Sequence, residues 1–183
     1  MIQQNKLHQS GNSIGLFVIC LILLLAFYRQ ILSNELPCPL CLLQRLCYIA
    51  VGICFCMNLV LGSKPSHYGV MLLAAILGLI IALRQIFIHT TPGDLGYGSP
   101  LLGLHLYKWS AIIFIFIIVG IASAFLLENG FVVSPLPLSR LFFIPMFFFL
   151  LLIIANGIST FLECGASNCR DNPLSYYLLE TTG

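Results

Sequence analysis

Two cysteines separated by two residues, Cys38 and Cys41, lie between the end of one long apolar segment and the start of the next. Thiols at this spacing can close a small disulfide ring. The second sulfur is expected in the first turn of the following helix, where the helix dipole stabilises a thiolate. The pair is therefore a candidate redox element at the end of an apolar segment.

Three polar residues are expected to share the depth of this pair. Arg45 follows Cys41 by four residues, so on a helix it lies on the same face, one turn further along. An arginine inside an apolar span is costly unless it has a role or snorkels to the lipid headgroups. We expect Arg45 to stabilise the Cys41 thiolate and to bind a carbonyl oxygen, with Gln44 and Arg84 at a similar height. Snorkelling is the alternative for both arginines.

A second pair, Cys164 and Cys169, follows the last apolar segment. Five crossings in total leave four between the two pairs, so both pairs would lie in one compartment. Disulfides persist there if that compartment is oxidising. A purely structural disulfide across so short a loop would stabilise the fold by only about 2 kcal/mol, through the restriction of the unfolded chain. We therefore favour a role of this pair in thiol exchange. A zinc site built from both pairs is the alternative. The remaining cysteines lie within spans and are expected to pack as small apolar residues: Cys20, Cys47, Cys54 and Cys56.

The composition is that of an integral membrane protein. Of the 183 residues 60% are hydrophobic and 8% charged, and the mean hydropathy is +1.03. Apolar runs of about 20 residues, enough to cross a hydrocarbon core, occur at five places. They cover residues 14–32, 42–61, 68–88, 110–127 and 141–161. We expect an all-α polytopic membrane helix bundle that forms a single domain over residues 1–183.

The charges of the connections give a weak orientation signal. The first span is expected to stay as an anchor, because it is longer than a signal-peptide core and no small-residue cleavage site follows it. With the N-terminus in the cytoplasm, Lys6, Lys64 and Arg140 face inward, following the positive-inside tendency. Both cysteine pairs, the connection 89–109 and the C-terminal tail then face outward.

The connection 89–109 is the longest between the expected spans. Ser99 and Pro100 form a typical helix start, with serine as the cap and proline in the first turn. The leucines and aromatic residues that follow predict a short interfacial segment, helical from Ser99. His105 within it is a candidate proton donor.

The chemistry at the first pair indicates the kind of oxidant. A thiolate and a guanidinium between apolar walls suit a flat, lipophilic molecule whose carbonyl oxygens become hydroxyls on reduction, as in a quinone. The sequence has no haem-ligand pattern, and Gly96 and Gly98 lack the strand and helix of a nucleotide-binding glycine motif. We therefore expect a quinone from the membrane, either ubiquinone or menaquinone, as the electron acceptor.

The run from Leu36 to Arg45, with its Cys-x-x-Cys and an arginine four residues later, resembles the disulfide bond formation protein B (DsbB) family. Arg84, residues 103–107 and the tail 163–173 also look like a branch of that family. The resemblance implies that Cys38 and Cys41 form the quinone-proximal disulfide, with Cys41 facing the ring and Arg45 contacting the quinone.

The resemblance also implies that Cys164 and Cys169 are the outer pair, which would meet a thioredoxin-like oxidase resembling DsbA. The chain departs from the family's four-span pattern here, because that pattern has the outer pair on the loop between the third and fourth spans. The corresponding connection, residues 89–109, has no cysteine. Exchange between the two pairs thus depends on whether the tail can reach the first pair.

Together these features predict an enzyme of the bacterial inner membrane, a thiol:quinone oxidoreductase that reoxidises a periplasmic DsbA-like oxidase and supports protein disulfide bond formation. The expected partners are that oxidase, the quinone pool and the lipid bilayer, with no nucleic acid and no bound metal. One alternative is a vitamin K epoxide reductase-like enzyme, although its quinone-proximal pair lies late in the bundle. Another is a non-enzymatic membrane protein that binds a soft metal through its thiols.

Overall fold

The chain forms five long helices and one short one. The computed structural model describes residues 2–33, 35–94, 96–126, 140–165, 169, 173 and 175–180. The helices are α1 (Ile2–Leu32), α2 (Pro39–Leu61), α3 (Pro65–Ile88), α4 (Leu106–Leu126), α5 (Arg140–Cys164) and α6 (Tyr177–Glu180). Each of the five long helices is apolar and long enough to cross a membrane, which confirms the all-α polytopic bundle. The expected connection between the last two spans, residues 128–140, lies outside the described residues except for Arg140, where α5 begins.

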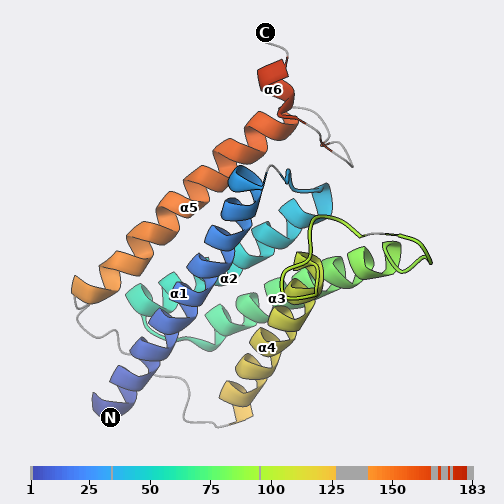
Figure 1. Ribbon diagram of the computed structural model, residues 1–183. Coiled ribbons are helices and arrows are strands. Elements are labelled where there is room, and N and C mark those ends of the chain that lie inside the picture. Colours follow the sequence, from blue (N-terminus) through green and yellow to red (C-terminus); the bar gives the residue numbers. More distant parts are fainter. Residues whose placement is uncertain are drawn as a thin grey trace.

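The order in which the helices pack leaves a space between α1 and α4, which do not follow each other in the chain. Helix α2 packs on α1 and α3, α4 packs mainly on α3, and α5 packs mainly on α1. Figure 1 shows α5 alongside α1 on one side of the bundle and α4 on the other. The end of α1, the start of α2 and the end of α5 lie at the same end of the bundle (Figure 1). Because α4 is held by α3, the faces of α1 and α4 stay apart.

Glycines let aromatic rings pack tightly between these helices. A Cβ atom on Gly78 would lie 2.3 Å from the ring of Phe114, and one on Gly52 would lie 2.3 Å from the ring of Phe149. Small residues are typical of such close contacts between membrane helices. The Phe114 ring also stacks on Tyr48, with centroids 4.3 Å apart. This packing fixes the position of α4 relative to α2 and α3.

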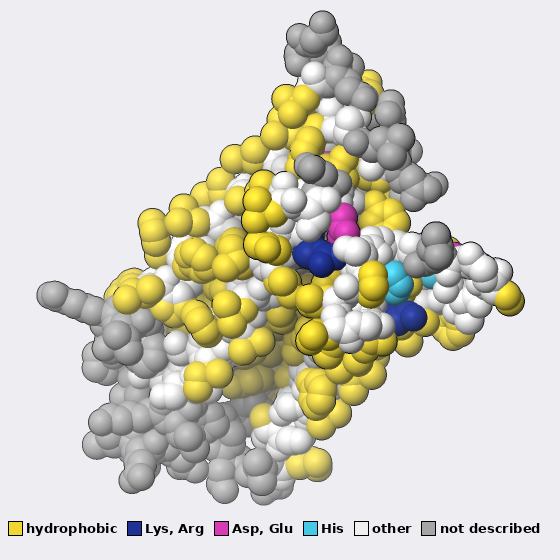
Figure 2. All heavy atoms as spheres, viewed as in Figure 1, with side chains coloured by type: hydrophobic (Ala, Val, Ile, Leu, Met, Phe, Trp, Pro, Cys, Tyr) yellow, Lys and Arg dark blue, Asp and Glu magenta, His cyan; other side chains and the backbone are white. Residues whose placement is uncertain are grey.

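The surface is that expected of a protein in lipid. Apolar side chains cover most of the face in Figure 2, and the charged side chains visible there gather toward one end. Exposed apolar residues occur on all five long helices, with Leu73 69% exposed and Phe116 72% exposed. Side chains this large and apolar would form an aggregation-prone surface in water. The chain is a multi-pass membrane protein.

A buried polar cluster joins α1, α2 and α3 at the end of the bundle remote from Cys38. Asn58 Nδ2 donates to Asn12 Oδ1 at 2.9 Å, and Asn58 Oδ1 lies 2.8 Å from Nδ1 of His67. Asn12 also donates to Ser63 Oγ at 3.2 Å. Buried polar groups paired in this way fix the register of neighbouring membrane helices.

The interfacial helix expected from Ser99 is wrong. Residues 101–104 instead form a tight turn, closed by backbone hydrogen bonds of 2.8 and 3.1 Å between Leu101 and Leu104. Leu102 has φ 52° and Gly103 has φ 82°. Residues in this left-handed conformation cannot continue a right-handed helix. The segment is therefore a loop, and the helix begins only at Leu106.

Candidate active site

The start of α2 holds the first cysteine pair. Pro39 occupies the first turn, where its missing N–H costs nothing, and Cys38 is the cap residue. The Cys38 sulfur accepts a hydrogen bond from the Cys41 backbone N–H at 3.3 Å, and the two sulfurs lie 2.6 Å apart. The hydrogen bond with the Cys41 side chain, together with burial, raises the pKa of Cys38. Cys38 thus keeps its proton, while the helix N-terminus favours a thiolate at Cys41.

A buried amide from α3 contacts both sulfurs. Gln85 is 1% exposed, and its Nε2 donates to Cys38 Sγ at 3.3 Å and to Cys41 Sγ at 3.4 Å. Its Oε1 accepts a hydrogen bond from Gln44 Nε2 at 2.8 Å. Gln44 therefore fixes the orientation of the amide that faces the thiols. The sequence reasoning missed Gln85, whose only signal was an amide inside an apolar span.

Arg45 is held inside the bundle by α1. Its Nη1 donates to Gln30 Oε1 at 2.7 Å and its Nη2 to the Ala26 carbonyl at 3.1 Å. The guanidinium also lies over the ring of Phe27, 5.7 Å from the centroid, as in a cation–π contact. These contacts occupy the side chain within the protein, where the Cys41 sulfur lies within its electrostatic range.

Arg84 and His105, both proposed from the sequence as site residues, do not contact the two thiols. Arg84 is exposed and lies among apolar side chains such as Leu83 and Phe87. One residue further, the helix has turned by about 100° and points Gln85 inward. His105 binds the Gly98 carbonyl through Nδ1 at 3.0 Å and does not line the cavity described next.

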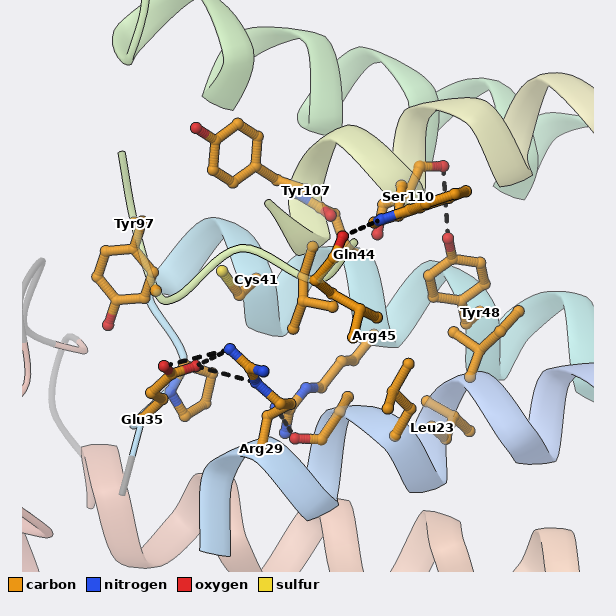
Figure 3. Close-up of a pocket in the computed structure, with 18 of the residues that line it drawn as sticks. Leu23, Arg29, Glu35, Cys41, Gln44, Arg45, Tyr48, Tyr97, Tyr107 and Ser110 are labelled. Carbon is orange, nitrogen blue, oxygen red and sulfur yellow. Dashed lines mark hydrogen bonds and ion pairs between the residues drawn. The ribbon is translucent and has the colours of Figure 1, made fainter. Parts of the chain in front are cut away.

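A cavity of about 320 Å³ lies between α1, α2, α4 and the loop before α4. Figure 3 shows Cys41 and Arg45 from α2, Leu23 from α1 and Tyr107 from α4 around it. Its walls are mainly apolar, and Figure 2 shows the surface hollowed between α1 and α4. Ligand sites for flat organic molecules have this character, an apolar cavity with a few polar groups that orient the ligand.

A polar latch fastens the loop over the outer end of the cavity. Arg29 Nη2 lies 3.1 Å from Glu35 Oε2 and donates to the Ser99 carbonyl at 2.7 Å, as part of the contacts drawn in Figure 3. Partial burial works against ionisation of Glu35, but hydrogen bonds from Ser99 and Arg29 outweigh it and lower the pKa of this carboxyl. Tyr97 adds a hydrogen bond to the Leu36 carbonyl at 2.6 Å. The loop is therefore fastened to the end of α1 and to the segment that precedes Cys38.

The second cysteine pair is joined as a disulfide, with Cα atoms 4.6 Å apart. Cys164 ends α5 and is buried, whereas Cys169 is partly exposed. The tail is attached to the first site through Gln30, whose Nε2 donates to Ser159 Oγ at 2.6 Å and to Tyr176 Oη at 3.1 Å. Both cysteine pairs thus lie at the same end of the bundle, as Figure 1 shows for the helix ends that carry them.

Comparison with known proteins identifies relatives for the first half of the chain. The family model "Disulfide bond formation protein DsbB" matches residues 10–97. The protein named "Disulfide bond formation protein B" from Nitrosomonas eutropha is 36% identical over 93 residues, covering 46% of this chain and 57% of the relative. The one from Stutzerimonas stutzeri is 33% identical over 91 residues, covering 44% and 55%.

A longer match is weaker. The protein of the same name from Burkholderia thailandensis is 25% identical over 160 residues, covering 68% of this chain and 95% of the relative. The chain spans about half the length of the first relatives it matches, between 50% and 57%. No solved structure matches. The family match contains Cys38, Cys41 and Arg45 but ends well before the tail pair.

Proposed function

Because residues 10–97 match the model of the disulfide bond formation protein B family, we propose that the chain belongs to this family and is a membrane thiol:quinone oxidoreductase that supports protein disulfide bond formation. One observation carries the proposal. The Gln85 amide donates to both sulfurs of the first pair, and Cys41 and Arg45 line an apolar cavity next to it. A reactive dithiol and a lipid-soluble acceptor could meet there without passing through water.

The cavity fits a quinone headgroup in size and in chemistry. Its walls are apolar, it is hollowed toward the lipid between α1 and α4, and it holds a cation beside a thiol. We propose that Arg45 holds a quinone carbonyl oxygen and that Cys41 faces the ring. A bound ubiquinone or menaquinone would supply a two-electron, two-proton acceptor at this place.

The protein's own groups prepare the dithiol. Cys41 carries the reactive thiolate, stabilised by the start of α2, by the Arg45 charge and by the Gln85 amide. Cys38 keeps its proton until the disulfide forms. The Gln85 amide lies within hydrogen-bond distance of both sulfurs, so it can donate to whichever of them is the thiolate. The loop, fastened to Arg29 and Leu36, limits the access of large soluble thiols to the pair.

The tail pair is proposed to face the protein partner. Cys169 is the more exposed of its two sulfurs and is the first target for a reduced thioredoxin-like oxidase of the DsbA type. In this proposal the chain lies in the bacterial inner membrane with its N-terminus in the cytoplasm, and both pairs face the periplasm. That compartment allows disulfides to persist.

Trapping the partner tests this order of events. A thioredoxin-like oxidase without its resolving cysteine, activated as the mixed disulfide with thionitrobenzoate, is mixed with the Cys164→Ser variant, in which Cys169 cannot close its intramolecular disulfide. The Cys169 thiolate attacks the oxidase sulfur and releases thionitrobenzoate. We expect a stable mixed disulfide at Cys169, located by mass spectrometry of the cross-linked peptides. The Cys169→Ser variant is the matched control and should trap far less, because Cys164 is buried.

A mixed disulfide found only at Cys38 in the protein with all its cysteines would contradict the outer role of the tail. The quinone-linked role of the first pair would then stand without the tail pair as an intermediate.

A further inference from the structure

Glu163, near the end of α5, is a buried acid that the proposed mechanism does not use. It is 5% exposed, and its buried Oε2 atom has no hydrogen-bond partner among the described residues. Burying a carboxyl oxygen without a hydrogen-bond partner is unfavourable. Such groups are concentrated where proteins move charge.

The surroundings of Glu163 link it to both cysteine pairs. Its carboxyl lies within electrostatic range of the Arg45 guanidinium and the Cys41 sulfur, both on α2. The next residue in the chain is Cys164 of the tail disulfide. Within the described part of the chain, the other titratable groups that act electrostatically in this region are Cys38, Tyr97 of the loop before α4 and Tyr176 of the tail.

The polar contacts of α1 hold this arrangement together. Gln30 is 2% exposed, accepts from Arg45 at 2.7 Å and donates to Ser159 of α5 at 2.6 Å. Ser159 lies one helical turn before Glu163. The end of α5 is therefore fastened to the same guanidinium that faces the Cys41 sulfur.

We propose that Glu163 carries a proton between the two cysteine pairs during their thiol–disulfide exchange. The inference rests on the proposed function, because it requires that the tail pair reduces the first pair. A thiolate is the attacking species in such an exchange, so a buried thiol needs a base that removes its proton. Glu163 is the carboxyl adjacent to Cys164 and in range of Cys41.

The exchange conserves atoms and electrons. Glu163 accepts the proton of the Cys164 thiol, and the Cys164 thiolate attacks Cys38, which breaks the Cys38–Cys41 bond and releases Cys41 as a thiolate. Cys169 then loses its proton and attacks Cys164, which releases Cys38. The protons of the two tail thiols end on the first pair, one of them by way of Glu163. Two electrons pass from the tail dithiol, which is oxidised, to the disulfide of the first pair, which is reduced.

The test is made on detergent-solubilised protein free of quinone, with both disulfides formed. Reduced thioredoxin is added as the probe, and samples are acid-quenched, alkylated and analysed by mass spectrometry for free thiols at each cysteine. Four proteins are compared: the wild type, Glu163→Gln, Glu163→Asp and the control Asp94→Asn. The control removes a carboxylate that binds His89 and Gly96 in the loop. Thermal unfolding checks that all four are folded.

We expect the Glu163→Gln variant to accumulate protein reduced only at the tail, with transfer to the first pair slowed about 100-fold near neutral pH. Its transfer rate should recover as the pH is raised toward about 8.5, where thiols ionise without a base. Glu163→Asp should retain most of the wild-type rate, and Asp94→Asn all of it. A role for Glu163 in packing alone would produce neither the recovery at high pH nor the rescue by aspartate.

Two results would overturn different parts of the scheme. If Glu163→Gln matches the wild type in both rate and pH profile, Glu163 does not carry the proton, and the two-pair route is unaffected. If the first pair of the double variant Cys164→Ser/Cys169→Ser is reduced at the wild-type rate, electrons do not pass through the tail pair. There is then no exchange between the pairs in which Glu163 could carry a proton.

Discussion

Replacing Cys41 by serine is expected to abolish thiol-dependent quinone reduction, with a loss of at least about 1,000-fold, as for other enzymes that lose their nucleophile. Serine cannot form a disulfide with Cys38, and its hydroxyl is not ionised near neutral pH. The loss should be seen when a reduced thioredoxin-like oxidase drives reduction of a short-chain ubiquinone, followed by quinone absorbance.

A matched control lies on the same helix. Cys56→Ser changes a half-buried cysteine of α2 that is remote from the cavity, and it should leave the rate within about twofold of the wild type. A Cys41→Ser protein that is folded and reduces quinone at the normal rate would show that the electrons take another path.

Replacing Gln85 by leucine is expected to slow quinone reduction by about 10- to 100-fold. The substitution removes the amide that donates to both sulfurs, at 3.3 and 3.4 Å, from a buried position. Hydrogen bonds to a charged group contribute about 1.5–3 kcal/mol, and 1.4 kcal/mol corresponds to tenfold in rate. The rate at which iodoacetamide alkylates Cys41 in the reduced protein should fall as well, because the thiolate loses a donor.

The neighbouring Arg84→Leu variant separates this role from the general properties of α3. Arg84 lies on the exposed side of the helix, so its replacement should change neither the alkylation rate nor quinone reduction by more than about twofold. Equal losses in the two variants, or a loss only in Arg84→Leu, would contradict the geometry of the site.

The five spans and the first thiol site could be predicted from the sequence because their signals are local. Apolar runs report directly on membrane spans, and α-helical spacing places Arg45 on the face of Cys41. The same reasoning gave the right depth in the third span but selected Arg84 instead of Gln85. A span that is apolar on all sides gives no periodic signal of which face points inward. The sequence therefore could not show that Gln85, and not the neighbouring Arg84, faces the thiols.

The rest of the site depends on contacts between distant parts of the chain. Gln30 connects Arg45 to α5 across a sequence separation of 129 residues to Ser159, which no local pattern encodes. Glu163 was recognisable only as an acid near the end of a span, because its burial comes from tertiary packing. The expected helix at Ser99 failed because Leu102 and Gly103 adopt left-handed conformations, which the capping signal at Ser99 and Pro100 could not reveal.

The central claim, that the first pair passes its electrons directly to a quinone, is tested by counting thiols. The Cys164→Ser/Cys169→Ser protein, reduced at Cys38 and Cys41 and freed of reductant, is mixed with excess short-chain ubiquinone. The account predicts that two thiols are lost for each quinone reduced, with Cys38 and Cys41 recovered as a disulfide. Free thiols that persist beside oxidised quinone, or quinone reduction that continues after both thiols are alkylated, would contradict it.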